Sequence, residues 1–479
     1  MSLKKQAASG VKWSALSQIG RQAMQFATTT VLARLLLPSD FGLVGMATIV
    51  LGFINLFSDL GTSAAVIQRK NTSDSLLQSI FWINIGFGFL GTAILFVCSP
   101  LIASFYQEPR VIPVLRVLSL TFFISGFSIL QKALLERDLA FNTLAKVELS
   151  AVVSGSVVGI GSALLGFGVW SLVYQSLAVV IATTLSLWVA TRWKPQLTFC
   201  GSELREVSNY SLNLTGFNIY NYFSRNADYL LIGRFLGTQD LGYYTLAYRL
   251  MIFPLLNISL MLSRVMFPVF SQFQDDNAKF SRVYLKVVGA IALITFPMMI
   301  ALWAVAEPFI VTLFGSQWRP VILLLMILAP VGMGQSIGTT VGQIYQAKGR
   351  TDWLFRWGVV AGLVFMIAFV IGLHWGIVGV ATGYAIAYTI LQYPSFAIPF
   401  RLINLRVWDL GTILVRPLFC SLLMLMVLLA VKFLLPTNLS SSWILGILVS
   451  TGCITYLLVS WLINREQMQQ FLGMVGLNK

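Results

Sequence analysis

The stretch Ala33–Gly42 (ARLLLPSDFG) recurs 200 positions later as Gly233–Gly242 (GRFLGTQDLG). Both copies carry the pattern Arg-x-Leu-x-x-x-Asp-x-Gly without a gap, and each stands where one long apolar segment ends and another begins. A fixed period in a sequence reflects a repeated structural unit. The repeated polar corner therefore predicts two related halves of one bundle.

The composition predicts an all-α polytopic membrane protein. Hydrophobic residues make up 57% of the chain and charged residues only 10%, whereas a soluble domain carries about 25% charged residues. Apolar runs of about 20 residues recur along the whole sequence, which is the length that crosses a bilayer as a helix. Every span is expected to be helical, because lipid offers no partner for an open sheet edge. No small-residue cleavage site follows the basic stretch 1–12, so the first span is expected to stay in the protein.

We predict about 14 transmembrane helices, arranged as two parallel six-helix bundles around a central cavity plus a C-terminal helix pair. Residues 1–200 are expected to form the N-terminal bundle and 201–400 the C-terminal bundle. Residues 401–479 are expected to add the last two spans and a cytoplasmic tail. The predicted spans are 12–35, 42–66, 77–103, 111–131, 144–167, 169–191, 210–233, 242–268, 286–306, 320–343, 355–373, 377–399, 410–434 and 442–463.

The distribution of charge predicts the orientation of the chain. When loops are assigned alternately to the two sides, most of the 32 Lys and Arg residues fall on the side of the N-terminus. Positively charged loops stay in the cytoplasm, so both termini are expected to be cytoplasmic and both repeated corners to face outward. The net charge of +15 then reflects topology, and no nucleic-acid partner is expected.

No catalytic or metal-binding motif stands out, so we predict no enzyme, no metal and no cofactor. The four cysteines (Cys98, Cys200, Cys420, Cys453) are scattered, without metal-type spacing, and His374 is the single histidine. The phosphate-binding pattern GxxxxGK[ST] is absent, which argues against ATP hydrolysis by the chain itself. With short loops throughout, function is expected to lie inside the bundle or at its rims.

Ionisable residues inside predicted spans are the candidates for function, because a charge at the bilayer centre costs about 2.5–3.5 kcal/mol. Arg21 either extends to the inner headgroups or faces the cavity. Arg225 and Asp228 share a helix face, and either pair with each other or line the cavity. Asp59 is a candidate ion-coupling residue or the counter-ion of a nearby arginine. The seventh span is unusually polar, and its further cavity-lining candidates are Asn213, Asn218, Asn221, Tyr222 and Asn226.

Glycines repeat every four residues in the fifth and tenth spans, at Gly155 and Gly159 and again at Gly334, Gly338 and Gly342. Such small-residue faces allow helices to approach closely. We expect static packing at most of them, the alternative being a sliding surface.

Several segments, spread over about residues 10 to 400, together resemble polysaccharide flippases of the multidrug/oligosaccharidyl-lipid/polysaccharide exporter superfamily. The resemblance is closest to the O-antigen and colanic-acid type. The segments that carry it are Lys12–Ser14, Ala33–Leu36, Asp40–Gly42, Phe57–Gly61, Val66–Arg69, Asn226–Arg234, Tyr243–Leu250, Phe267–Pro268 before Gln272, Leu313–Gly315 with Trp318, and Ala347–Arg350.

The resemblance implies transport of a polyprenyl-diphosphate-linked oligosaccharide from the inner to the outer leaflet by alternating access. It implies a role in lipopolysaccharide or exopolysaccharide biosynthesis in a bacterial inner membrane, and a polysaccharide polymerase or export complex as partner. Cationic residues are expected near the diphosphate, and Arg21, Arg225 and Arg249 are the candidates. Coupling to protons or sodium is common in the superfamily, which makes Asp59 the coupling candidate.

Two rival functions remain open. A small-molecule or multidrug exporter of the same superfamily would bind cationic drugs through cavity carboxylates, of which the sequence has few. A membrane polymerase or ligase would need a large outer loop with essential residues, and none is predicted.

Overall fold

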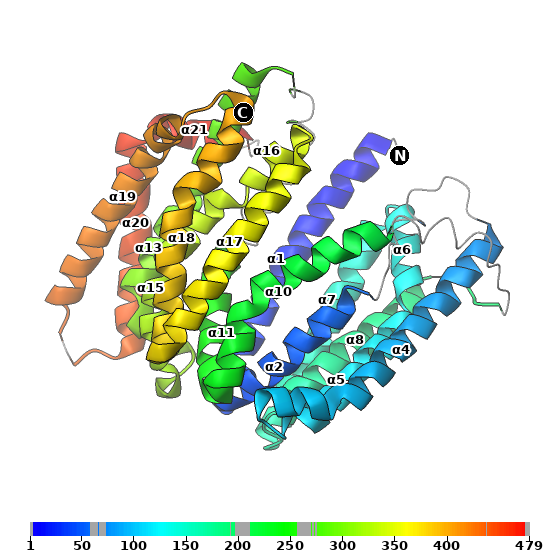
Figure 1. The fold of residues 1–479 in the computed structure, drawn as a ribbon. Helices are drawn as coiled ribbons and strands as arrows, with labels where there is room; N and C mark the ends of the chain where they lie inside the picture. The colour runs from blue at the N-terminus through cyan, green and yellow to red at the C-terminus, as the bar shows by residue number, and fades with distance from the viewer. Residues whose placement is uncertain are drawn as a thin grey trace. The chain divides into compact units, whose positions relative to one another are not determined.

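The computed structural model describes most of the chain. Side chains and backbone are described for residues 17–57, 66, 73–191, 193–196, 219–255, 270, 273, 275–436 and 438–469, and the helical backbone also for 3–16, 211–218 and 470–474. Within these ranges the chain forms helices joined by short turns and no strand (Figure 1). The prediction of an all-helical fold is confirmed.

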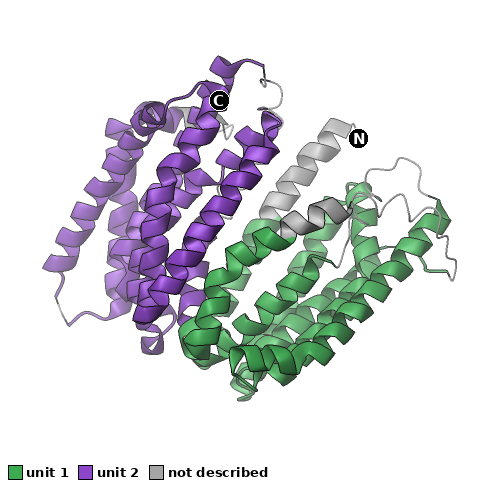
Figure 2. Ribbon diagram, in the orientation of Figure 1, with its two compact units in different colours: residues 1–242 green, residues 243–479 purple. Residues whose placement is uncertain are grey.

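The chain divides into two compact units, residues 1–242 and 243–479 (Figure 2). The first unit contains α1 (Leu3–Leu35), α2 (Pro38–Asn55), α4 (Asp74–Tyr106), α5 (Val111–Gly126), α6 (Ile129–Arg137), α7 (Phe141–Leu164), α8 (Trp170–Ala190) and α10 (Ser211–Phe235). The unit boundary falls within α11 (Gly237–Pro254). The second unit continues with α13 (Asn277–Ala304), α14 (Ala306–Leu313), α15 (Pro320–Gly338), α16 (Val341–Ala347), α17 (Thr351–Gly372), α18 (Gly376–Phe400), α19 (Val407–Leu434), α20 (Ser441–Ile463) and α21 (Arg465–Met474).

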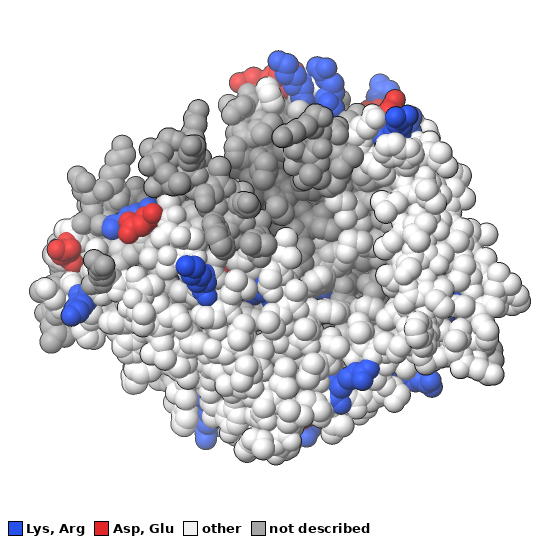
Figure 3. Space-filling view, turned by 180° about the vertical axis from the view of Figure 1, so that it is seen from behind, with Lys and Arg blue, Asp and Glu red and all other residues white. Residues whose placement is uncertain are grey.

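Each predicted span overlaps one of these helices or a broken pair of them. Among the described residues, nine helical segments are long and apolar enough to cross a membrane, or ten if α5 and α6, bent by 43°, form one span. One of the nine covers both α17 and α18. The chain is therefore a multi-pass membrane protein, and the predicted number of fourteen spans is not confirmed. Most of the described residues visible in Figure 3 are uncharged, as expected for helices that contact lipid.

In the first unit, α7 is a central helix that packs against both α1 and α8. Gly155 and Gly159 allow the close approach of α8: a Cβ on Gly155 would lie 2.3 Å from the side chain of Val179, and one on Gly159 would lie 2.9 Å from Cβ of Gln175. Replacing these glycines would therefore force the helices apart. This geometry is the close helix approach expected of a small-residue face, and static packing in the fifth span stays a prediction.

In the second unit, α13 is the central helix and packs against α15 and α19. Its inner core contains Phe280 and Tyr284, which lie against Phe400 of α18 and other buried residues. The C-terminal pair α19 and α20 is joined to this core, because the Tyr456 hydroxyl donates a hydrogen bond of 2.6 Å to the carbonyl of Leu293. The last two helices are thus an integral part of the second unit.

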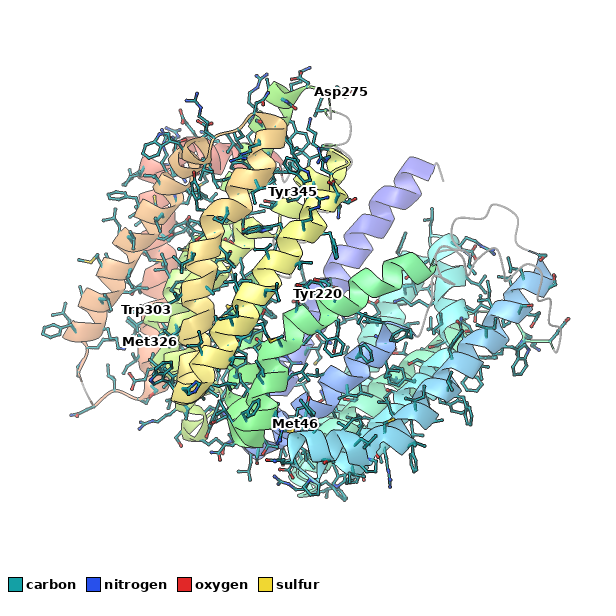
Figure 4. The ribbon with its side chains drawn as sticks, in the orientation of Figure 1. Met46, Tyr220, Asp275, Trp303, Met326 and Tyr345 are labelled. Carbon is teal, nitrogen blue, oxygen red and sulfur yellow. The ribbon has the colours of Figure 1, made fainter. Side chains whose placement is uncertain are left out.

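An apolar cavity of about 230 Å³ lies between α13, α15 and α19 of the second unit. Trp303, labelled in Figure 4, lines it together with Met333 and Leu422. The lining offers no charged group among the described residues. It does not provide a site for an anion.

Candidate functional site: the polar corner and the α1–α7 ion pair

The first repeated corner closes the turn between α1 and α2. Pro38 is the first residue of α2, where a missing N–H costs nothing and its fixed φ favours the helix. The Asp40 carboxylate accepts a hydrogen bond of 3.0 Å from the backbone N–H of Leu37. An acid in the first turn also interacts favourably with the helix dipole. The sequence motif therefore defines where α2 begins.

The two repeated corners contact each other within the first unit, and the contact is reciprocal. A Cβ on Gly42 would lie 1.7 Å from the carbonyl oxygen of Thr238, and a Cβ on Gly242 would lie 1.9 Å from that of Pro38. Neither position has room for a side chain, because the obstructing atoms belong to the backbone. Glycine at both positions is thus required by the close approach of the two helix starts.

The turn between α4 and α5 carries an ion pair, and its Arg110 also interacts electrostatically with Asp40 of the first corner. Two hydrogen bonds of 2.8 and 2.9 Å run from the Arg110 guanidinium to the Glu108 carboxylate. They lower the pKa of Glu108 below its ordinary value. Because Arg110 is largely exposed, this pair contributes little stability.

Arg21 of α1 forms an ion pair with Glu148 of α7, at 3.4 Å between Nη1 and Oε2. It also donates a hydrogen bond to Gln18, one turn earlier on the same helix. The side chains of Arg21 and Glu148 are 30% and 34% exposed. Both side chains therefore retain accessible surface that a ligand can contact.

The positions of the two residues along their helices follow from the helical rise. At about 1.5 Å per residue, Glu148 lies about 10 Å from the start of α7 at Phe141, and Arg21 about 20 Å from the end of α1 at Leu35. Both residues fall inside the predicted spans 12–35 and 144–167. Charges inside a membrane span are tolerated where they pair with one another or face a water-filled space. Arg21 is thus paired with Glu148, and whether it faces the cavity or extends to the headgroups stays a prediction.

The polar residues of α10 form a chain of contacts toward α2. The Tyr222 hydroxyl donates a hydrogen bond of 2.5 Å to the carbonyl of Ile49, and it lies directly over Gly52. The Asn226 side-chain amide donates to the Tyr222 carbonyl at 2.8 Å. Figure 4 labels Tyr220 on α10 and Met46 on α2, the two helices that these contacts join. Part of the polarity of this helix is thus used for packing.

The charged residues of α10 differ in burial. Asp228 is 4% exposed, and its carboxylate accepts a hydrogen bond of 2.9 Å from the backbone N–H of Tyr229. Arg225 and Asn221 are exposed. Both of these side chains are accessible to a ligand.

The other predicted site residues lie elsewhere. Arg249 belongs to the second unit, where it is exposed on α11. Asp59 lies outside the described residues, as do the side chains of Asn213 and Asn218. Of the three candidate arginines, the first unit contains Arg21 and Arg225.

Glu148 is a further candidate residue that was not predicted from the sequence. The signal for it was present, because it is an acid inside the predicted span 144–167. Its partner could not be predicted, since the contact between α1 and α7 joins segments far apart in the sequence. Within the part of the chain that the structure describes, no group of three or more His, Cys, Asp or Glu side chains is placed to hold a metal ion.

A chain whose described helices include nine segments long and apolar enough to cross a membrane belongs to the class of polytopic helical membrane proteins. A family model described as "Polysaccharide biosynthesis protein" matches residues 31–323. The chain is 30% identical over 426 residues to the lipopolysaccharide biosynthesis protein WzxC of Escherichia coli, covering 85% of each chain. The protein belongs to this polysaccharide biosynthesis family.

A second relative agrees with this assignment. The chain is 30% identical over 363 residues to the teichuronic acid biosynthesis protein TuaB of Bacillus subtilis, covering 74% of each chain. Its fold is similar to that of the lipid II flippase MurJ in an inward closed conformation, with a TM-score of 0.76 at 15% identity. This similarity covers 95% of the present chain and 99% of MurJ. At that identity it shows the shared fold alone.

Proposed function

We propose that the protein is a flippase that moves polyprenyl-diphosphate-linked oligosaccharide repeat units from the inner to the outer leaflet of a bacterial inner membrane. The observation that carries the proposal is the partly exposed Arg21–Glu148 pair, which joins two predicted spans in a member of the polysaccharide biosynthesis family. A diphosphate headgroup must cross the apolar core, and an accessible guanidinium there provides charge and paired donors for it.

The candidate residues take the following roles in this proposal. Arg21, Arg225 and Arg249 contact the diphosphate during its passage, because a guanidinium binds phosphate oxygens through two parallel hydrogen bonds. The residues proposed to line the sugar's path are Asn213, Asn218, Asn221, Tyr222, Asn226 and Asp228. Asp59 is proposed to couple transport to protons or sodium, or to act as a counter-ion.

We further propose that residues 1–200 and 201–400 form two parallel bundles that provide alternating access, with 401–479 appended to the second. Both termini are proposed to be cytoplasmic, so that the repeated corners face outward. The repeat units delivered to the outer leaflet are proposed to pass to a polysaccharide polymerase or export complex.

The proposal is tested in liposomes that contain the purified full chain. A polyprenyl diphosphate with a radiolabelled sugar is placed in both leaflets, and a membrane-impermeant glycosidase measures how fast the inner pool reaches the outside. We expect protein-dependent translocation of this lipid and no faster movement of a labelled phosphatidylcholine. Equal rates for both lipids, or a rate equal to that of empty liposomes, would contradict the proposal.

The same liposomes distinguish the rival exporter. Uptake of a cationic dye in the absence of translocation of the lipid-linked sugar would favour a small-molecule exporter. In cells, deletion of the gene should leave uncoupled lipid-linked repeat units on the inner leaflet, whereas long polymers there would indicate a different function.

A further inference from the structure

We infer that Glu148 is a placeholder for the anionic headgroup: in the empty protein its carboxylate occupies the position on Arg21 that a diphosphate oxygen takes when the substrate binds. The inference rests on the proposed function, and adds to it a residue that sets the affinity of the site. Glu148 acts by competing with the substrate for the same guanidinium.

The chemistry of the pair supports this exchange. A carboxylate and a phosphate both present oxygen acceptors that fit a guanidinium, and the phosphate carries more charge. Arg21 also donates a hydrogen bond to Gln18, which holds the guanidinium on the α1 side when Glu148 is displaced. The arginine is thus kept in place while its anionic partner changes.

The partial exposure of the pair lowers the free energy needed to separate its two charges. Arg21 and Glu148 are each about one-third exposed, so water solvates both charges when they separate. Exposed ion pairs contribute little to stability, because the attraction between the charges is offset by solvation. A fully buried pair would instead leave an uncompensated charge when it opens.

The packing between α1 and α7 does not depend on the ion pair. About two turns further along both helices, Thr28 donates a hydrogen bond of 2.7 Å to Ser156, and these side chains are 2% and 6% exposed. This buried contact keeps the two helices together when the pair opens. The release of Glu148 is then a side-chain movement on a fixed helix pair.

The effect of the competitor follows from the population of free Arg21. If the pair is favoured by about 0.2–1 kcal/mol, Arg21 is paired with Glu148 more often than it is free. Removing Glu148 makes all of the Arg21 free, and the apparent affinity for the anion then rises about two- to sixfold at 25 °C. Tighter binding does not speed transport, because the headgroup must leave again. Removing the competitor is therefore expected to tighten binding and to slow turnover.

The test is a double-mutant cycle on the full chain in detergent, with farnesyl diphosphate as the probe and binding measured by calorimetry. Glu148→Gln is expected to bind the probe about two- to sixfold more tightly. Arg21→Gln is expected to bind it weakly, and the double variant to bind as weakly as Arg21→Gln. If Glu148→Gln also tightens binding in the Arg21→Gln background, the two residues do not act on each other and the inference fails.

Glu136→Gln is the matched control for loss of a negative charge. Glu136 lies on α6 of the same unit, pairs with Lys132 at 3.9 Å, and has a side chain 33% exposed. Its substitution is expected to leave the affinity for farnesyl diphosphate unchanged. An equal gain in affinity with Glu136→Gln would attribute the effect to net charge and overturn the role of Glu148.

The outcomes separate this inference from the proposed function. Binding that depends on Arg21 but is unaffected by Glu148→Gln would refute the placeholder and leave the flippase proposal intact. No binding of the probe by the native protein, together with no translocation of the lipid-linked sugar, would refute both. If Glu148→Gln does not fold, Glu148→Asp shortens the reach of the carboxylate and is expected to give a smaller gain in affinity; no gain would refute the inference.

Discussion

Gly42 and Gly242 occupy the same position in the two copies of the repeated corner, and each lies against the backbone of the other copy. A Cβ on Gly42 would approach the Thr238 carbonyl, and a Cβ on Gly242 the Pro38 carbonyl, both at less than 2 Å. The same relationship therefore holds when the two copies are exchanged. The repeat seen in the sequence corresponds to a physical contact.

Substitution of either glycine by alanine is expected to open this contact. The added methyl group has no space against a backbone carbonyl, and overpacking of this kind costs about 1–3 kcal/mol. We expect Gly242→Ala to lower the thermal midpoint of the detergent-purified protein and to reduce translocation. Gly86→Ala in α4 is the control, because no atom lies within 4 Å of a Cβ placed there. An unchanged midpoint for Gly242→Ala would show that the contact does not contribute to stability.

Arg21→Gln is expected to abolish most translocation of the lipid-linked sugar in liposomes, because it removes the charge and the paired donors that contact a diphosphate. Arg21→Lys keeps the charge without the planar geometry and is expected to retain a minor part of the rate. Lys432→Gln is the control, since Lys432 pairs with Glu307 in the second unit and is no substrate candidate. A native rate for Arg21→Gln would remove Arg21 from the proposed site.

Tyr222→Phe removes the hydroxyl that bonds to the Ile49 carbonyl. We expect a loss of about 0.5–1.5 kcal/mol in stability, the usual net contribution of one hydrogen bond. Thermal unfolding monitored by intrinsic fluorescence measures it. If Tyr222 instead contacts the sugar, the translocation rate will fall while the unfolding midpoint stays at the native value.

A cysteine introduced at Ser39, in a variant without the native cysteines, is expected to react with a membrane-impermeant maleimide in intact cells. Ser39 belongs to the corner that is predicted to face outward. A cysteine at Asp138, an exposed residue at the end of α6, is the control and is expected to react only after permeabilisation. The reverse pattern would invert the proposed orientation.

An inside-negative membrane potential is expected to accelerate outward movement of the headgroup. If the diphosphate carries about two negative charges, the potential contributes about 4–5 kcal/mol per 100 mV. A potassium diffusion potential set across the liposomes with valinomycin tests this. A rate that does not change with potential would exclude electrical driving.

The helical fold was predictable because a 57% hydrophobic chain with apolar runs of membrane length has few alternatives. Asp40 and Gly42 were recognisable from the repeat, although their contact with the other copy was not. Arg21 was identified because a charge inside an apolar span is costly. Its partner Glu148 was not, since pairing between α1 and α7 depends on tertiary packing. For Tyr222 the sequence showed polarity, but not that its hydroxyl bonds to a backbone carbonyl.

The contact between Gly42 and Gly242 has the form of an isologous interface, in which a residue i meets j of the partner and j meets i. Here both partners belong to one chain, so a single substitution changes one of the two equivalent glycine–backbone contacts and leaves the other unaltered in sequence. Once one alanine has separated the corners, the second has space. The effects of Gly42→Ala and Gly242→Ala on stability are therefore expected to be less than additive, as for residues that share one contact.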